Sequence, residues 1–466
     1  MIRLTLAEVA EAMGVRGDWD APPRSVRGVS TDSRTVQREE LFFALRGPNF
    51  DGHDYAHDAL RRGAAAAVIG MQRRVDLARD GEFDGRLIPV DDPLAALARL
   101  ARYHRGQLAA TLVAVVGSNG KTTTKAMIDH VLSARLHGRS SPKSFNNAVG
   151  VPLTLLGSEA ADDYLVVEIG SNAAGEIAAL AEIVAPDMAV ITSIGEEHLL
   201  GLRDLDGVAD EECAILDSLS ESGFAAVNAD CAAIASRLTG RKLRIGSFGK
   251  SEAADLRIGS LTHAGEGLRF TLNERFAYEL RTPAAHDAWN AAAAITIARR
   301  LGFEHEELAE RLSSFHAPRM RSEVIRCGRL TLINDAYNSN PPSALAAIDT
   351  LERYPADGRR IFVMGEMREL GERSAELHER VALRLRAAAV EHVVLVGPPA
   401  EMMWKTLSER GRRPRAVRCP DVSACISVLR ELAQPGDVVL LKASRAVGLE
   451  RVVDPLRGHW SAEPVA

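Results

Sequence analysis

The segment Val115–Thr123 constrains the fold of this chain most strongly, because two glycines there join an apolar run to a helical one. It reads Val-Val-Gly-Ser-Asn-Gly-Lys-Thr-Thr, follows the strand-like run Leu112–Val116 and precedes the helical run Thr124–Leu132. A glycine loop in that position turns backbone N–H groups and a helix N-terminus toward a phosphate, while the lysine reaches the β and γ phosphates and the next hydroxyl binds Mg²⁺. The pattern predicts an ATP-binding loop formed by Gly117, Ser118, Asn119, Gly120, Lys121, Thr122 and Thr123.

The spacing of this loop is shorter than in the common P-loop, in which a glycine would stand at Val115. The alternative is a chance glycine turn that carries an exposed lysine. An ATP site alone would leave three kinds of protein open: a kinase, a motor or switch ATPase, and an ATP-dependent ligase.

The length and the alternation of apolar runs indicate the domain organisation. The chain has 466 residues, enough for about three domains of roughly 150 residues each. Strand-like runs alternate with helical ones, which is typical of mostly parallel sheets covered by helices. We expect an α/β protein with a small α/β domain over residues 1–91, a central P-loop ATPase-like domain with a mostly parallel sheet over 92–317, and a Rossmann-like C-terminal domain over 318–466.

The expected secondary structure follows from the same patterns. Strands are predicted at Leu41–Ala44, Ala65–Ile69, Leu112–Val116, Leu165–Ile169, Met188–Ile194, Phe224–Val227, Leu330–Ile333, Ile361–Met364, Val393–Val396 and Val438–Leu441. Helices are predicted to begin near Pro93, Pro341, Ser374, Glu401 and Val422.

Charge and cysteine content argue against several classes of protein. With 57 basic and 63 acidic side chains the net charge is -6, so no general attraction to nucleic acid or anionic membrane is expected. The apolar runs fall well short of the roughly 18 residues of a membrane span, and no signal-peptide core is evident. The five cysteines are widely spaced without a C-x-x-C pair, which argues against a zinc cluster and fits a reducing compartment. We expect a cytoplasmic monomer with no membrane span and no nucleic-acid partner.

Two further candidates stand at predicted strand ends. Glu168 ends the run Leu165–Ile169, and His198 follows the next strand. The carboxyl ends of parallel strands meet at the edge of a sheet where ligands bind. A carboxylate and a histidine there can together hold a second Mg²⁺.

Motifs along nearly the whole chain resemble the Mur ligase family. They are Ser30–Val36, Leu41–Leu45, Asp51–Tyr55, the loop described above, Phe145–Leu155, Glu168–Asn172, Gly175–Ile177, His286-x-x-x-Asn290, Pro318–Glu323, Asp335–Pro341, Met364–Gly371 and Leu441–Arg445. Within the family, the segment Tyr337–Pro341 resembles the dipeptide-adding member. The resemblance implies a ligase that uses ATP and Mg²⁺ to join D-alanyl-D-alanine to a UDP-N-acetylmuramoyl-tripeptide through an acyl phosphate, in peptidoglycan precursor synthesis.

The resemblance also implies roles for individual residues. Catalytic roles fall to Lys121, Glu168 and His198, and metal binding to Thr122, Glu168 and His198; Glu212 joins both sets because of its position fourteen residues after His198. His286, Asn290, Arg321 and Asp335 would complete the ATP site. The UDP-substrate candidates, in a uridine-nucleotide domain and beside the loop, are Ser33, Arg34, Asn146, Asn147 and Ser171. The dipeptide candidates are Asn338, Asn340, Lys442 and Ser444.

The chain departs from the family pattern near His198. Relatives carry a carbamoylated lysine fourteen residues beyond the metal-binding histidine, and here that position is Glu212. A glutamate can supply the negative charge directly. Glu196 and Glu197 replace small residues, and Leu200 stands where relatives have an acid. Because of these departures two alternatives stay open: a Mur-type ligase with a different acceptor, and a nucleotide-binding protein without ligase activity.

Overall fold

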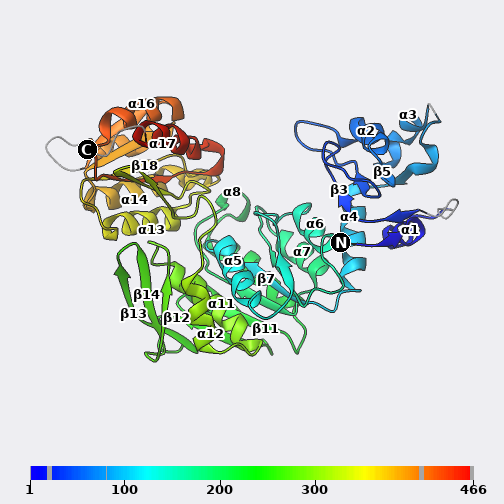
Figure 1. Ribbon diagram of the computed structural model, residues 1–466, viewed down its shortest axis with the longest axis horizontal. Helices are drawn as coiled ribbons and strands as arrows, with labels where there is room; N and C mark the ends of the chain where they lie inside the picture. The colour runs from blue at the N-terminus through cyan, green and yellow to red at the C-terminus, as the bar shows by residue number, and fades with distance from the viewer. Residues whose placement is uncertain (1, 18–23, 80, 409–413, 462–466) are drawn as a thin grey trace.

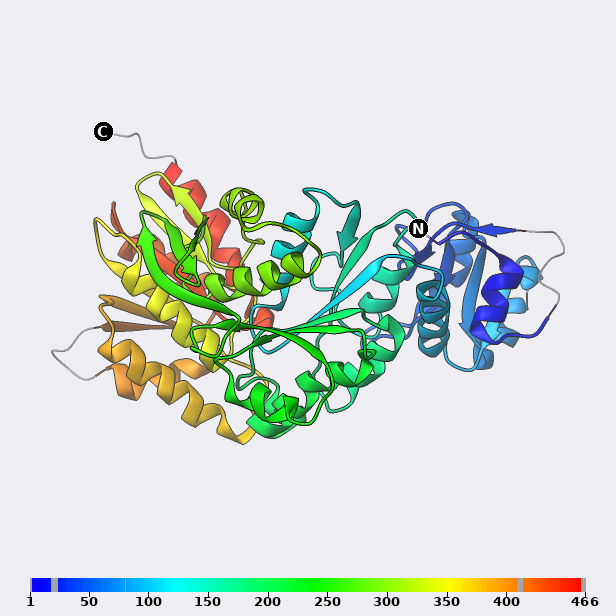
Figure 2. The ribbon, with the colours of Figure 1, turned by 90° about the horizontal axis from the view of Figure 1, so that it is seen from below.

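The computed structural model describes residues 2–17, 24–79, 81–408 and 414–461. The chain forms an elongated molecule with the N-terminal part at one end, a central part around the largest sheet, and the C-terminal part at the other end (Figures 1 and 2). No helix among the described residues is long and apolar enough to cross a membrane.

The N-terminal part is built on the parallel sheet β3-β4-β5-β6. Alternate residues of β4 face opposite ways, so Phe42 packs with α2 while Leu41 and Phe43 pack toward α1 and α4. The elements are β1 Leu4–Thr5, α1 Leu6–Met13, β2 Ser25–Val26, β3 Val29–Ser30, β4 Leu41–Phe43, η1 Gly52–Tyr55, α2 Ala56–Arg61, β5 Ala66–Gly70, η2 Met71–Arg73, α3 Arg74–Ala78, η3 Asp84–Arg86, β6 Leu87–Val90 and α4 Pro93–Arg105.

Helix α4 joins the N-terminal part to the central part. Asp92 caps its first turn by accepting a 2.8 Å hydrogen bond from the N–H of Leu94, and Pro93 stands at the first helical position. Leu97 and Leu100 belong to one apolar core that includes strand residues of both parts. The helix therefore packs on both sheets.

The central part contains a nine-stranded sheet of order β15-β14-β13-β12-β11-β10-β7-β9-β8. Its elements are β7 Thr111–Val116, α5 Lys121–Leu132, β8 Gly138–Ser140, α6 Gly150–Leu156, β9 Tyr164–Glu168, α7 Glu176–Val184, β10 Met188–Ile191, α8 Leu199–Leu202, α9 Leu205–Cys213, η4 Ala214–Ser218, β11 Phe224–Asn228, α10 Ala232–Leu238, β12 Arg244–Gly249, β13 Leu256–Ala264, β14 Gly267–Leu272, β15 Phe276–Leu280, α11 Asp287–Arg300 and α12 His305–Ser313.

Strand β7 is buried on both faces, which explains its unbroken apolar run. Leu112, Ala114 and Val116 face the side covered by α4, α6 and α7, whereas Val113 and Val115 face α5 and α11. Its parallel neighbours β9 and β10 end at the same edge, as the sequence predicts.

This sheet differs from the sequence-based expectation in several strands, since β8, β12 and β13 were not predicted. The antiparallel strands β14 and β15 extend it beyond β13 and were also not predicted. Strand β10 ends at Ile191 rather than at Ile194. Beyond this strand the chain contacts the phosphate loop: the carbonyl of Ser193 accepts a 2.7 Å hydrogen bond from the N–H of Ser118, and the hydroxyl of Thr192 donates to the carbonyl of Asn119 at 2.6 Å.

The C-terminal part has a six-stranded sheet of order β16-β17-β21-β18-β19-β20, parallel except for β16. Helices α13, α14 and α15 pack on one face and α16 and α17 on the other. The elements are β16 Glu323–Cys327, β17 Leu330–Asn334, α13 Pro341–Arg353, β18 Arg360–Met364, η5 Gly371–Arg373, α14 Ser374–Ala387, β19 His392–Val396, α15 Pro399–Leu407, β20 Arg415–Cys419, α16 Val422–Leu432, β21 Val438–Lys442, η6 Arg445–Val447, η7 Leu449–Val452 and α17 Val453–Ser461.

Candidate functional site

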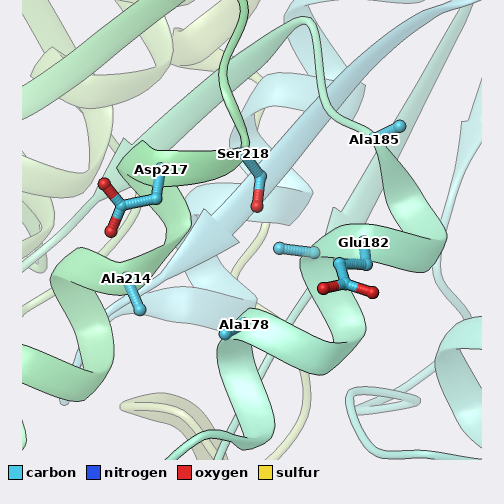
Figure 3. Close-up of a pocket in the computed structure, with 7 residues that line it drawn as sticks. Ala178, Glu182, Ala185, Ala214, Asp217 and Ser218 are labelled. Atoms are coloured by element: carbon cyan, nitrogen blue, oxygen red, sulfur yellow. The ribbon is translucent and has the colours of Figure 1, made fainter.

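A cavity of about 800 Å³ lies between the central and C-terminal parts. Most of the candidate residues predicted from the sequence line it. They are Ser118, Asn119, Gly120, Lys121, Thr122, Thr123, Asn146, Asn147, Glu168, Ser171, His198, His286, Asn290, Arg321, Asp335, Asn338, Asn340, Lys442 and Ser444. A smaller hollow of about 330 Å³ between α7 and η4 is lined largely by alanine, with Glu182 and Asp217 beside it (Figure 3). The candidate residues thus gather around the larger cavity.

The phosphate loop joins β7 to α5 through two glycines in the left-handed region. Gly117 has φ +121° and Gly120 has φ +88°. A Cβ on Gly117 would lie 2.2 Å from Oγ1 of Thr192, and one on Gly120 would lie 2.3 Å from Oδ1 of Asn290. Only glycine fits at these two positions, because both the backbone angle and the available space exclude a side chain.

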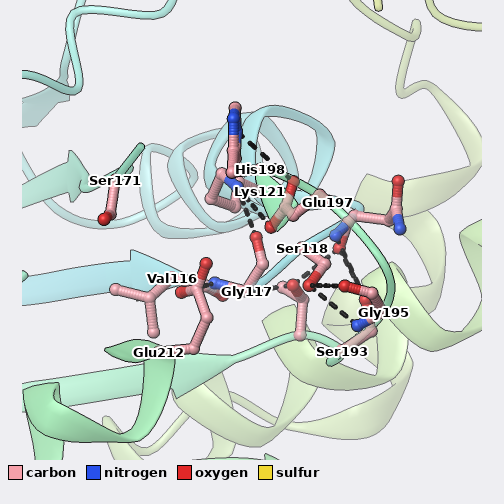
Figure 4. A network of polar contacts seen from close by, with 12 residues as sticks. Val116, Gly117, Ser118, Lys121, Ser171, Ser193, Gly195, Glu197, His198 and Glu212 are labelled. Carbon is pink, nitrogen blue, oxygen red and sulfur yellow. Dashed lines mark hydrogen bonds and ion pairs between the residues drawn. The ribbon is translucent and has the colours of Figure 1, made fainter. Parts of the chain in front are cut away.

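Lys121 opens α5 and points back over the loop (Figure 4). Its Nζ donates to the carbonyl of Gly117 and lies 3.8 Å from Oε1 of Glu197. Burial opposes the charged form of Lys121, but Glu197, Glu212 and Glu168 together hold its pKa above the usual value. Lys121 is therefore a cation whose charge is balanced by neighbouring carboxylates.

Glu212 lies beneath the loop rather than in the cavity. It is buried on α9, and its Oε2 accepts a 2.6 Å hydrogen bond from the backbone N–H of Gly117. Burial raises the pKa of both Glu212 and its hydrogen-bonded neighbour Glu197, while Lys121 opposes the shift. Glu212 is not among the described residues that line the cavity.

The neighbouring Glu211 has a different role. Its carboxylate accepts hydrogen bonds from the N–H groups of Gly175, at 2.6 Å, and Ile177, at 2.7 Å. These groups belong to the N-cap and the first turn of α7, so the buried Glu211 caps that helix.

Glu168 ends β9 at the floor of the cavity and is almost fully buried. Its Oε2 lies 3.1 Å from Nζ of Lys125, and its Oε1 accepts a 3.1 Å hydrogen bond from Nδ2 of Asn146. Lys125 is a functional candidate that the sequence analysis missed. Its spacing of four residues from Lys121 places both lysines on one face of α5, and this spacing was the available signal.

His198 lies between the two parts of the molecule. Its Nε2 is 3.8 Å from Oε2 of Glu197, and its Nδ1 hydrogen bonds to Oε2 of Glu369, which belongs to the C-terminal part. Burial lowers the pKa of His198, although Glu369 opposes that shift. Glu369 was not singled out from the sequence, although it stands in the Met364–Gly371 motif.

The C-terminal part places cationic side chains against the loop. Nη2 of Arg321 donates a 2.7 Å hydrogen bond to Oγ1 of Thr122. Lys442 is buried, with Nζ 2.7 Å from Oδ2 of Asp335 and 2.8 Å from the carbonyl oxygen of Asn338. Arg321 and Lys442 therefore reach one cavity from different strand ends.

The other end of the cavity is formed by the start of α11. Asn290 donates a 2.8 Å hydrogen bond to Asp287 and accepts one of 3.2 Å from Thr124. Trp289, which the sequence analysis did not single out, also lines the cavity, and its indole N–H donates to Asp230 at 2.6 Å. The side chain of His286 is exposed there.

Three of the remaining polar candidates also have local structural roles. Asn147 accepts hydrogen bonds from the N–H groups of Val149 and Gly150, and Asn340 caps α13. The hydroxyl of Ser444 accepts a 2.9 Å hydrogen bond from the N–H of Arg368. These side chains shape the cavity wall as well as lining it.

Ser33 and Arg34 lie in the N-terminal part, away from this cavity. The guanidinium of Arg34 is exposed and pairs with Asp32 at 2.7 Å, and that pairing lowers the pKa of Asp32 to about 2. Their predicted contact with a UDP group therefore concerns a separate surface of the molecule.

The donors around the cavity are compatible with Mg²⁺. The Thr122 hydroxyl and the Glu168 carboxylate are oxygen donors on the cavity wall, and the His198 imidazole is a nitrogen donor. In the part of the chain that the structure describes, no group of three or more His, Cys, Asp or Glu side chains could hold a metal ion. Mg²⁺ is usually held by one or two carboxylates together with phosphate oxygens and water, so this sparse donor set fits it.

Family models match three stretches of the chain. The Mur ligase middle domain matches residues 115–298, the Mur ligase glutamate ligase domain matches 320–445, and the Mur ligase family catalytic domain matches 25–105. Together they cover both sides of the cavity.

Curated relatives and solved structures are similar over nearly the whole chain. The UDP-N-acetylmuramoyl-tripeptide--D-alanyl-D-alanine ligases of Bacillus subtilis and Escherichia coli are each 31% identical over 98% of this chain and 99% of their own length. A crystal structure of MurF from Acinetobacter baumannii gives a TM-score of 0.86 at 26% identity, covering 98% of this chain and 99% of that one. MurF ligase from Thermotoga maritima in complex with ADP gives 0.80 at 27% identity, covering 96% and 99%.

Proposed function

The chain belongs to the Mur ligase family, and from that premise we propose that it joins D-alanyl-D-alanine to UDP-N-acetylmuramoyl-tripeptide with hydrolysis of ATP to ADP and phosphate. The observation that carries the proposal is the cavity itself. In it, Lys121 and Glu168 of the central part face Arg321 and Lys442 of the C-terminal part. The full-length similarity to ligases with that name supports the choice of substrates.

The reaction needs an activated carboxyl group, because a carboxylate is a poor electrophile. The tripeptide carboxylate attacks the γ-phosphorus of ATP, ADP leaves, and an acyl phosphate forms. The free amine of D-alanyl-D-alanine then attacks the acyl carbon, the tetrahedral intermediate expels phosphate, and the amine nitrogen loses a proton. Such chemistry depends chiefly on positioning and on neutralising charge around the transferred phosphoryl group.

The residues of the loop would bind the triphosphate. Backbone N–H groups at the start of α5 would face the phosphates, with Lys121 as a point charge on the β and γ groups. Arg321 would add a second cation at the γ group, since it already contacts the loop at Thr122. Asn290 and His286 would lie beside the adenine, and Asp335 beside the ribose.

Metal binding would involve Thr122, Glu168 and His198, with Glu212 as a further anionic group. Bound Mg²⁺ neutralises phosphate charge and aligns the γ group with the attacking carboxylate. Lys125 would hold the Glu168 carboxylate in place through its 3.1 Å ion pair. Asn146, which donates to the same carboxylate, would fix its orientation.

The substrates would enter from opposite sides. Ser33 and Arg34 would bind the uridine nucleotide, while Asn146, Asn147 and Ser171 would contact the muramoyl group. Asn338, Asn340, Lys442 and Ser444 would receive the dipeptide. We further propose functional domains at 1–91, 92–317 and 318–466, and a monomeric protein that works in the cytoplasm, where its five free thiols would stay reduced.

Phosphate release tests the function. We expect release of phosphate from ATP only when UDP-N-acetylmuramoyl-tripeptide and D-alanyl-D-alanine are both present, together with a product whose mass is that of the two substrates less one water. Release with the tripeptide and another amine but not with the dipeptide would favour a ligase with a different acceptor. ATP binding without release under any combination would favour a nucleotide-binding protein without ligase activity.

A further inference from the structure

A carboxylate from the C-terminal part holds the histidine of the central part. Oε2 of Glu369 hydrogen bonds to Nδ1 of His198. The contact is reinforced by the backbone, because the N–H of Leu200 donates a 3.1 Å hydrogen bond to the carbonyl of Glu369. The segment around His198 is thus joined to the segment around Glu369 by both side chain and main chain.

Both residues adopt an uncommon backbone conformation. His198 has φ +48° and Glu369 has φ +64°, in the left-handed region that side chains other than glycine adopt rarely. Such conformations persist only where surrounding contacts fix them. Leu199 and Leu202 of α8 supply those contacts, because they are buried in the apolar core of the C-terminal part. Figure 1 shows α8 at this junction.

The bond assigns the hydrogen position on the imidazole. A carboxylate oxygen accepts, so Nδ1 must donate, and in the neutral ring Nε2 then carries the lone pair. The ring lines the cavity, and a histidine that binds a metal usually donates its other N–H to a carboxylate. The contact between His198 and Glu369 matches that arrangement, with the carboxylate supplied by the C-terminal part.

We propose that Glu369 is a positioning residue that fixes His198 with Nδ1 as the donor and Nε2 free to bind a metal, and does so only while the C-terminal part contacts the central part. The metal-binding half of this statement rests on the proposed function. The tautomer and its dependence on Glu369 do not, because they can be measured without ligands.

The ring nitrogens can be observed directly in protein labelled with ¹⁵N-histidine. The His198 signals are assigned by their loss in His198→Gln. In the wild type, we expect a protonated Nδ1 and an unprotonated Nε2. Glu369→Ala should shift the signals toward the Nε2–H form, whereas Glu369→Gln should retain the Nδ1–H form because its amide oxygen still accepts. Glu372→Gln, an exposed carboxylate in the same loop, is the matched control and should change nothing.

A second variant tests the dependence on the contact between the parts. Arg380 forms an ion pair with Glu196 across the same junction, with nitrogen–oxygen distances of 2.9 Å and 2.6 Å. Arg380→Glu places two carboxylates together and should separate the parts, so the His198 signals should shift as they do in Glu369→Ala. Unchanged signals in an Arg380→Glu protein whose radius of gyration has increased would overturn this half of the proposal.

A measurement of metal binding distinguishes a failure of the positioning role of Glu369 from a failure of the proposed function. Electron spin resonance of Mn²⁺ with a non-hydrolysable ATP analogue should show affinity about 10- to 100-fold weaker in Glu369→Ala than in the wild type. Unchanged ring signals in Glu369→Ala would refute the positioning role alone. A wild type that does not bind Mn²⁺ with the analogue would refute the metal role and weaken the proposed function, whatever the ring signals show.

Discussion

Arg321 and Thr122 lie 199 positions apart in the chain and are joined by a 2.7 Å hydrogen bond. The guanidinium also lies over the ring of Tyr337, 4.2 Å from its centroid, so its direction is fixed from two sides. The phosphate loop and the C-terminal part are therefore already in contact at the place where we propose that the γ-phosphate binds.

Removing the Arg321 side chain should slow the reaction more than it weakens ATP binding. Arg321→Ala is expected to lower kcat by about 10²- to 10³-fold, the usual cost of losing one preorganised donor to developing charge. Arg321→Lys should recover only part of the rate, because an ammonium cannot reproduce the planar fork. Steady-state kinetics for both substrates measure this. The exposed Arg319→Ala serves as control, and a wild-type kcat in Arg321→Ala would contradict the role.

Lys121→Ala should abolish ATP turnover and leave the fold intact. The lysine is the point charge expected on the β and γ phosphates, and its loss removes the counter-ion of Glu197. The fold survives because Glu197, whose pKa burial already raises, can take up a proton instead of remaining a buried anion. Circular dichroism and phosphate release measure the two outcomes. Turnover at the wild-type rate would refute the assignment of the loop.

Glu212→Gln should lower kcat and raise the Mg²⁺ requirement. The amide oxygen can still accept from the N–H of Gly117, so the substitution keeps the shape of the loop and removes the negative charge beneath it. Activity should not depend on added bicarbonate, because a glutamate needs no carbamoylation. Titration of activity against Mg²⁺ tests this, with the exposed Asp206→Asn on the same helix as control. Full activity at limiting Mg²⁺ would exclude the role.

Glu211→Gln should affect stability rather than catalysis. Glutamine offers one acceptor oxygen where the carboxylate bonds to the N–H groups of both Gly175 and Ile177. The loss of one charged hydrogen bond in a buried setting should lower the free energy of unfolding by about 1.5–3 kcal/mol. Urea denaturation of the variant beside Glu212→Gln measures the difference. Equal stability to the wild type would show that the cap is dispensable.

Acidification should destabilise the protein through His378. This buried ring accepts a 3.1 Å hydrogen bond from the N–H of Met367 and bonds through Nδ1 to the carbonyl of Ser374, so it is neutral. Burial lowers the pKa of His378 below the ordinary histidine value of about 6.5. Well above a pH of about 6.5, the ring of His378 is unprotonated in both the native and the unfolded protein. As the pH falls below about 6.5, the unfolded chain takes up a proton that the native ring resists, so the free energy of unfolding falls by up to about 1.4 kcal/mol per pH unit.

Thermal unfolding between pH 7.5 and 5 checks this. His378→Gln should flatten the pH dependence, because glutamine can both accept from Met367 and donate to Ser374 without titrating. The exposed His459→Asn should keep the wild-type slope. The assignment fails if His378→Gln shows the wild-type slope.

The sequence predicted the central buried parallel strands, such as β7, β9 and β10, and the phosphate loop because local patterns determine them. A strand buried on both faces has no polar alternation, and the glycines of the loop are required by positive φ angles. The antiparallel β14 and β15 were missed because they are short, half-exposed strands that extend an existing sheet, so no continuous apolar run marks them.

Most residues of the candidate site could be predicted from the sequence, but the contacts between them could not. The cavity brings together most of the predicted side chains, because they follow strand ends or begin helices. The partners of Lys121 and Glu168, namely Glu197 and Lys125, follow from the register of β9, β10 and α5, which sequence patterns fix only to within a few residues. The pairing of His198 with Glu369 depends on how two parts of the chain meet, and no local pattern encodes that.

The insertion of α8 into the C-terminal core limits how this enzyme can be dissected. Leu199, Leu202 and Val208 belong to the central part, yet they complete the apolar core around Met367 and Leu370. A fragment containing residues 320–461 alone would carry an open apolar socket and would tend to self-associate. The central part and the C-terminal part therefore cannot be exchanged independently between relatives. In any chimera, residues 195–208 must come from the same relative as the C-terminal part.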